Sequence, residues 1–96
     1  MSSKQQHGGR AISTLRNLGP KSAMVLMQCG VRTIDELKEL GAVKAFVRAR
    51  ALRPKKVSLN LLWAIAAGLE DRDWRKLTQT EKSKLIGEVR RASRWR

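Results

Sequence analysis

The sequence predicts an all-α domain, a compact bundle of five to six short helices. Apolar residues recur at spacings of three and four along most of the chain, which places them on one face of a helix. Runs of alternating apolar and polar residues rich in β-branched side chains are missing, so strands are not expected. Glycine, proline and two Thr-x-x-Glu sequences divide the chain into segments of helical length.

The length and composition fit one domain with one modest core. The chain has 96 residues, of which 42% are hydrophobic. Residues 1–9 are polar and end in glycine, so we expect a flexible N-terminal tail followed by a single domain over residues 10–96.

Two helices are expected to form a hairpin at the start of the domain. The first covers residues 10–17, where apolar side chains share one face. Gly19 can adopt a positive φ, and Pro20 suits the first position of a helix. The second helix therefore begins at Pro20 and ends near Cys29.

The next two helices have clear boundaries in the sequence. Thr33-x-x-Glu36 is a capping box, which begins a helix over residues 34–40. A further helix covers residues 42–52 and is stopped by Pro54.

The segment over residues 59–69 predicts the central helix of the bundle. Ser58 is placed to cap it, and its residues are apolar nearly all round. We therefore expect the other helices to pack around it, with Trp63 in the core.

The last part of the chain predicts a short turn and a final helix. Asp73 is placed to cap a turn that contains Trp74 and Leu77. Thr78-x-x-Glu81 is a second capping box and begins the final helix.

Charge is the strongest functional signal in the sequence. The chain has 21 Lys and Arg against 8 Asp and Glu, a formal net charge of +13. Residues 1–34 hold five basic residues and residues 40–69 hold six, while all acidic residues lie within 35–39 and 70–88. This separation predicts a positive face built from the first hairpin, the fourth helix and the loop after it, and it favours a polyanionic partner. The alternative is a charged surface that only keeps the chain in solution.

The sequence Leu-Gly-Pro-Lys-Ser-Ala over residues 18–23 resembles the turn of a helix-hairpin-helix. A glycine hairpin leaves backbone N–H groups free at the start of the following helix, and these groups form an anion site. Gly19 lets a phosphate approach the backbone, Lys21 adds a charge and Ser22 adds a hydroxyl donor. Such contacts recognise the nucleic-acid backbone, so binding would be largely independent of base sequence. The alternative is a purely structural corner between two helices.

The predicted nucleic-acid-binding residues come from this hairpin and from the basic residues of the fourth helix and its following loop. They are Gly19, Lys21, Ser22, Lys44, Arg48, Lys55 and Lys56. Double-stranded DNA is the expected partner, although RNA remains open.

The sequence argues against an enzyme. It has no metal-ligand cluster, no nucleophile with a base and no phosphate loop, and its only histidine, His7, lies in the tail. Asp71 and Asp73 have no further ligands nearby, so capping is their expected role. We predict no catalytic residue, no metal, no cofactor and no small-molecule substrate. Cys29 is the only cysteine, and we expect it to be a buried structural thiol in a reducing compartment.

A membrane location is not expected. The N-terminus lacks the apolar segment of a signal peptide, and the longest apolar run is too short to cross a bilayer. The predicted location is the cytoplasm, with the nucleoid as its site if the protein binds DNA.

Four blocks of the sequence resemble the C-terminal domain of the TfoX/Sxy competence regulators. They are Thr14–Ala23, Gly30–Leu37 with Leu40–Val43, Val57–Ala64 and the Trp74-x-x-Leu77 element, and the match covers roughly residues 11–88. The resemblance implies an all-α, helix-hairpin-helix-like domain from a bacterium. It also implies a link to the regulation of competence and DNA uptake, with a transcription activator as a partner. These regulators usually carry an N-terminal α/β domain that this sequence does not supply, so we expect a stand-alone domain or a fragment.

Two functions remain open at this point. The first is a nucleic-acid-binding module. The second is a protein-interaction module of a transcription-regulatory complex that does not touch DNA and docks near Trp74 and Trp95. Steep salt dependence would distinguish the first from the second.

Overall fold

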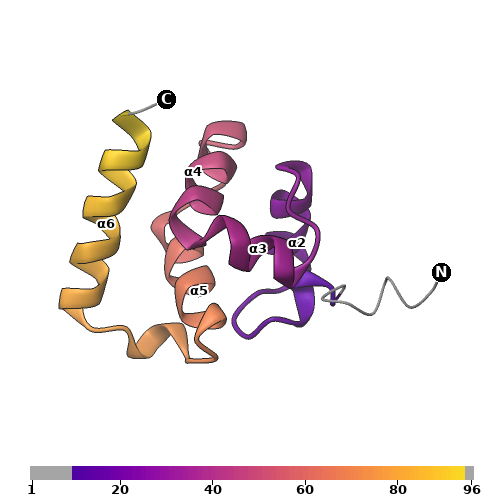
Figure 1. Ribbon diagram of the computed structural model, residues 1–96, viewed down its shortest axis with the longest axis horizontal. Helices are drawn as coiled ribbons and strands as arrows, with labels where there is room; N and C mark the ends of the chain where they lie inside the picture. Colours follow the sequence, from indigo (N-terminus) through magenta and orange to yellow (C-terminus); the bar gives the residue numbers. More distant parts are fainter. Residues whose placement is uncertain (1–9, 95–96) are drawn as a thin grey trace.

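The computed structural model describes residues 10–94, and the regular elements of this part of the chain are helices joined by short links (Figure 1). Five α-helices and two 3₁₀ turns follow one another in the order η1 (Ile12–Thr14), α2 (Pro20–Gln28), α3 (Ile34–Leu40), α4 (Ala42–Leu52), α5 (Leu59–Leu69), η2 (Trp74–Lys76) and α6 (Gln79–Arg94). The described residues contain no strand, only one isolated bridge between Ala11 and Thr33. The predicted all-α class is confirmed.

The predicted helix starts are confirmed by their capping bonds. The Thr33 hydroxyl accepts from the Glu36 N–H at 3.2 Å, and Ser58 caps α5 in a similar way. At the start of α6 the Thr78 hydroxyl accepts from the Glu81 N–H at 3.1 Å, and the Thr78 N–H donates to Glu81 Oε1 at 2.8 Å. These bonds satisfy backbone donors that have no partner within the helix.

The predicted helix over residues 10–17 is wrong, because this segment forms only the single turn η1. The carbonyl of Arg10 accepts from the Ile34 N–H at 3.1 Å, and the Thr14 hydroxyl bonds the carbonyl three residues before it at 2.6 Å. Asn17 has a φ of 75°, which no helix can contain. Hydrogen bonds to α3 and to local side chains thus replace the helical ladder. The predicted hairpin therefore consists of η1, a turn closed by the bond from the Leu18 N–H to the Leu15 carbonyl, and α2.

Helices α4 and α5 share the centre of the fold. Helix α4 packs against α2, α3, α5 and α6, whereas α5 packs mainly against α4 and η2 (Figure 1). The expectation that all helices pack around residues 59–69 is therefore wrong in part. Helix α4 has the small residues Ala45 and Ala49 in one buried cluster and Phe46 in another, so it can pack on two sides. The prediction that Trp63 lies in the core is confirmed, since it is 7% exposed.

Gly68 marks the point where the link before α2 crosses α5. A Cβ atom at this position would lie 2.5 Å from the carbonyl oxygen of Arg16 and 3.3 Å from the side chain of Leu15. Only glycine allows the two segments to approach so closely, and this contact fixes the start of the α2 hairpin on α5.

Within residues 10–94, every helix is too short or too polar to span a lipid bilayer.

Candidate nucleic-acid interface

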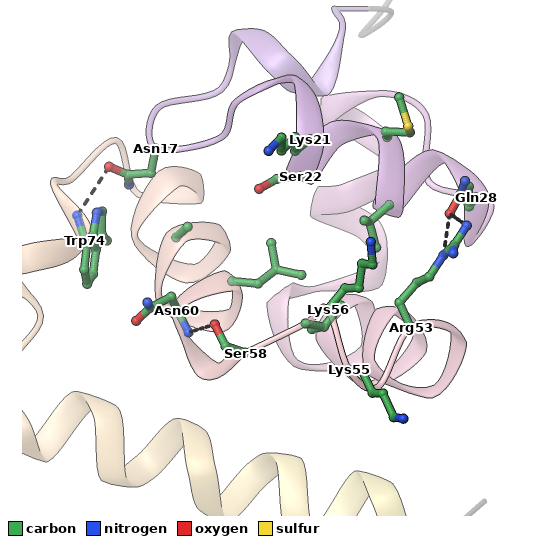
Figure 2. A pocket seen from close by; sticks show the side chains of 15 residues that line it. Asn17, Lys21, Ser22, Gln28, Arg53, Lys55, Lys56, Ser58, Asn60 and Trp74 are labelled. Carbon is green, nitrogen blue, oxygen red and sulfur yellow. Dashed lines mark hydrogen bonds between the residues drawn. The ribbon is translucent and has the colours of Figure 1, made fainter.

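A groove of about 800 Å³ lies between α2, the turn after α4, the start of α5 and η2 (Figure 2). Helix α2 and the turn provide most of its polar rim, and α5 provides much of its floor. The lining residues are Asn17, Lys21, Ser22, Met24, Val25, Gln28, Arg53, Lys55, Lys56, Val57, Ser58, Asn60, Leu61, Ala64 and Trp74.

The groove is strongly positive. Four of its lining side chains are cationic, and no Asp or Glu is among the described residues that line it. Figure 2 shows Lys56 reaching toward α2, where Lys21 lies, whereas Lys55 points away. The Arg53 guanidinium donates to Gln28 Oε1 at 3.2 and 3.1 Å, which joins the turn after α4 to the end of α2. Cations gathered without anions produce a positive potential that attracts a polyanion.

The first turns of two helices face this groove. Gly19 is the N-cap of α2 and has no side chain to accept from the N–H groups of Lys21 and Ser22. At the start of α5, the Ser58 hydroxyl accepts from the Asn60 N–H at 3.2 Å. The positive ends of both helix dipoles therefore add to the charge of the lysines, and free N–H groups at α2 can donate to an anion.

The floor of the groove is apolar. Val57, Leu61 and Ala64 lie along it, Met24 lies on one side with 59% of its surface exposed, and Trp74 lies at one end. The groove thus combines a cationic rim with an apolar floor.

Asn17 holds Trp74 in place relative to the start of α2. Its Nδ2 donates to the carbonyl of Arg72 at 2.7 Å, and its Oδ1 accepts from the Trp74 N–H at 3.4 Å. The positive φ of Asn17 is tolerated more readily by asparagine than by most residues. This residue therefore joins two walls of the groove.

An ion-pair network centred on Arg72 fixes the other side of η2. Its guanidinium donates to the two carboxylate oxygens of Glu81 at 2.8 and 3.1 Å, to Glu70 Oε1 at 3.0 Å and to the carbonyl of Lys76 at 3.3 Å. The bonds from Arg72, followed by the bond from the Thr78 N–H, lower the pKa of Glu81 from 4.5 to about 2. The network ties the turn that carries Trp74 to the first turn of α6.

This network predicts acid-sensitive stability. The lowered pKa of Glu81 means that its ionised form stabilises the fold above about pH 4.5, and that this contribution is lost as the pH falls toward 2. We expect the melting temperature of the wild type to fall through this window, and that of Glu81→Gln to fall less. Circular dichroism melts across the pH series measure it.

Glu39→Gln is the matched control, because it removes a carboxylate of α3 that makes none of these bonds. Its acid profile should follow that of the wild type. If the melting temperatures of Glu81→Gln and the wild type fell equally between pH 4.5 and 2, the assigned role of Glu81 would be contradicted.

The groove brings together part of the predicted site. Lys21, Ser22, Lys55 and Lys56 line it, and Gly19 directly precedes its α2 wall. The hairpin and the loop after α4 therefore meet, as the charge pattern suggested.

The remaining predicted residues, Lys44 and Arg48, are exposed on α4 and do not line the groove. Arg48 lies close enough to Cys29 for its charge to act on the thiol, whose pKa is raised by burial and lowered to a smaller degree by Arg48. Cys29 is half-buried, so the prediction of a buried thiol is wrong. Cys29 is the C-cap of α2, so it lies at the end of that helix and not within it.

Sequence reasoning missed five polar residues of the groove, which are Asn17, Gln28, Arg53, Ser58 and Asn60. Arg53 could have been found, because it stands beside Pro54, Lys55 and Lys56 in one basic run. Asn17 could not, because its role depends on partners far along the chain.

The other predictions concern metal ligands and the chain ends. Within residues 10–94, no three His, Cys, Asp or Glu side chains are close enough to hold a metal ion together. The predicted tail, His7 and Trp95 lie outside the described residues.

Comparison with known proteins gives one family and one related structure. The family described as the TfoX C-terminal domain matches residues 9–89. A crystal structure of an uncharacterized protein from Listeria monocytogenes, in a triclinic form, superposes with a TM-score of 0.75 at 25% identity, covering 86% of this chain and 93% of that one. No curated protein matches the sequence.

Proposed function

The chain belongs to the TfoX C-terminal domain family, and from this premise we propose that it is a non-enzymatic regulatory module that binds the phosphate backbone of nucleic acid. Double-stranded DNA in the cytoplasm or nucleoid is the proposed partner, and regulation of competence or transcription is the proposed context. The binding would not depend on base sequence, because helix N-termini and lysines contact phosphates.

One observation supports this proposal above the others. Lys21 and Lys56 line one groove, residues from the starts of α2 and α5 line it as well, and none of the described lining residues is acidic. Phosphate oxygens accept hydrogen bonds from backbone N–H groups and from ammonium groups alike. A phosphate therefore fits the lysines and the free N–H groups of this rim.

The salt dependence of DNA binding tests the proposal. We expect fluorescence anisotropy with a labelled duplex to show that the logarithm of the association constant falls linearly with the logarithm of salt concentration. Three cationic contacts, from Lys21, Arg53 and Lys56, correspond to a slope of roughly −3. Absence of DNA binding at low salt would contradict the proposal. The positive charge would then serve only to keep the chain in solution.

A protein partner is the second candidate function. Met24 and Met27 lie one turn apart on α2 and are 59% and 53% exposed. Methionine side chains adapt to varied apolar partners, so this face suits docking by a transcription activator or another regulatory protein. Such binding would have a fixed stoichiometry and a shallow salt dependence, unlike DNA binding.

A further inference from the structure

The groove contains more than a phosphate site requires. Contacts to the phosphates of a duplex need only a polar, positively charged surface. Here the rim encloses an apolar floor formed by Val57, Leu61 and Ala64, with Trp74 at one end. This apolar part calls for a ligand that also offers an apolar surface.

Trp74 is held ready to contact such a ligand. Its side chain is only partly buried and lines the groove (Figure 2). Its backbone N–H is bound by Asn17, and Arg72 fixes the turn from the other side. These bonds hold the backbone that carries the indole, so the turn needs little reordering when a flat ring packs on Trp74.

A nucleotide supplies both of the features that the groove can bind. Its base is a flat ring that stacks on an aromatic side chain whatever the base identity, and its phosphate is an anion. The hydroxyl of Ser22 and the amide of Asn60 also line the groove and can bond base or sugar groups. An acidic peptide would need a particular pattern of apolar and acidic side chains to do the same, so the observations favour nucleic acid.

We propose that the groove binds single-stranded nucleic acid, with one base against Trp74 and the neighbouring phosphates at Lys21 and Lys56. This inference rests on the phosphate binding of the proposed function, and it replaces the duplex by a single strand as the preferred ligand. In a duplex the bases are paired and stacked, so a duplex uses the cations and leaves the apolar floor empty. The groove therefore discriminates between the two forms of nucleic acid through Trp74.

The test compares a labelled oligo(dT) with a duplex of equal length by anisotropy at one salt concentration. The proteins are the wild type, Trp74→Leu and Trp74→Phe. Leucine keeps apolar volume against the core cluster that Trp74 contacts, and phenylalanine also keeps an aromatic face. Circular dichroism melts confirm that each variant is folded.

We expect the wild type to bind oligo(dT) about 5-fold or more tightly than the duplex. Trp74→Leu should weaken oligo(dT) binding by about 5- to 100-fold and leave duplex binding unchanged, and Trp74→Phe should recover most of the loss. Oligo(dT) should also quench the tryptophan emission of the wild type, and this quenching should be absent in Trp74→Phe.

Two other outcomes separate the inference from the proposed function. Equal affinity for both forms, unaffected by Trp74→Leu, would overturn the inference and leave phosphate binding intact. Binding of a polyglutamate peptide with no binding of either nucleic acid would overturn both, and would assign the groove to an acidic polypeptide.

Discussion

The double variant Lys21→Glu/Lys56→Glu is expected to bind nucleic acid about 100-fold more weakly than the wild type at low salt. Each lysine offers a charge-assisted bond to phosphate, and each glutamate adds repulsion in the groove. The slope of the salt dependence should become shallower by about 2, one unit for each lost phosphate contact. Anisotropy titrations across a salt series measure both effects.

A matched variant on α4 tests whether the loss of affinity is specific to residues of the groove. Lys44→Glu/Arg48→Glu changes the formal charge by the same amount, but both residues lie outside the groove. We expect it to lose less than about 5-fold in affinity, through long-range charge alone. Equal losses for the two double variants would show that the groove is not the main binding site.

A third pair controls for net charge away from both surfaces. Lys38 on α3 and Lys84 on α6 are exposed and line no part of the groove. The variant Lys38→Glu/Lys84→Glu should match the small loss expected for the α4 pair. A larger loss for the α4 pair than for this one would assign Lys44 and Arg48 to the interface.

The substitution Gly68→Ala is expected to be the most destabilising small change in the fold. The added methyl would lie 2.5 Å from a backbone carbonyl, so either α5 or the link before α2 must move. Such overpacking costs about 2–3 kcal/mol, which lowers the melting temperature by roughly 10–20 °C. Thermal and urea unfolding followed by circular dichroism measure this change.

Gly87→Ala is the control for this substitution. Gly87 lies within α6, and a Cβ atom there would meet only the Arg91 guanidinium, at 4.0 Å. Alanine favours the helix over glycine by about 1 kcal/mol, so this variant should be as stable as the wild type or more stable. Similar effects for the two variants would mean that the contact at Gly68 relaxes at little cost.

Local signals in the sequence predict most of the helix boundaries. The capping residues Thr33, Ser58 and Thr78 act within a few residues of themselves, so their bonds can be inferred before any packing is known. The same holds for Pro20 at the start of α2. Where the interaction partners are close in sequence, the structure agrees with the prediction.

The first predicted helix fails for the opposite reason. Its residues have an apolar spacing suited to a helix, but the Arg10 carbonyl bonds to Ile34, and Asn17 bonds to Arg72 and Trp74. Those partners come from other parts of the chain, and helical spacing carries no information about them.

For the candidate site too, the features that depend on local sequence could be predicted and those that depend on packing between distant segments could not. Lys21, Lys55 and Lys56 could be proposed from charge and from the glycine-proline turn. Their meeting with Trp74 in one groove could not, because that depends on how α2 and η2 pack. Sequence reasoning groups Lys44 and Arg48 with these residues because residues 40–69 contain no acidic residue, and neither of the two lines the groove.

The bonds of Asn17 also bear on the order in which the chain folds. They connect residues 55 and 57 positions apart, whereas α3, α4 and α5 are near neighbours along the chain. Closing so long a loop costs more entropy than forming local contacts, so this junction should form after the helices have assembled. For the same reason it should be among the first places to open in the native state, with fast amide exchange around Trp74. A nucleic acid that contacts both α2 and η2 would stabilise the contact between these two segments. Amide exchange around Trp74 should therefore become slower when the groove is occupied.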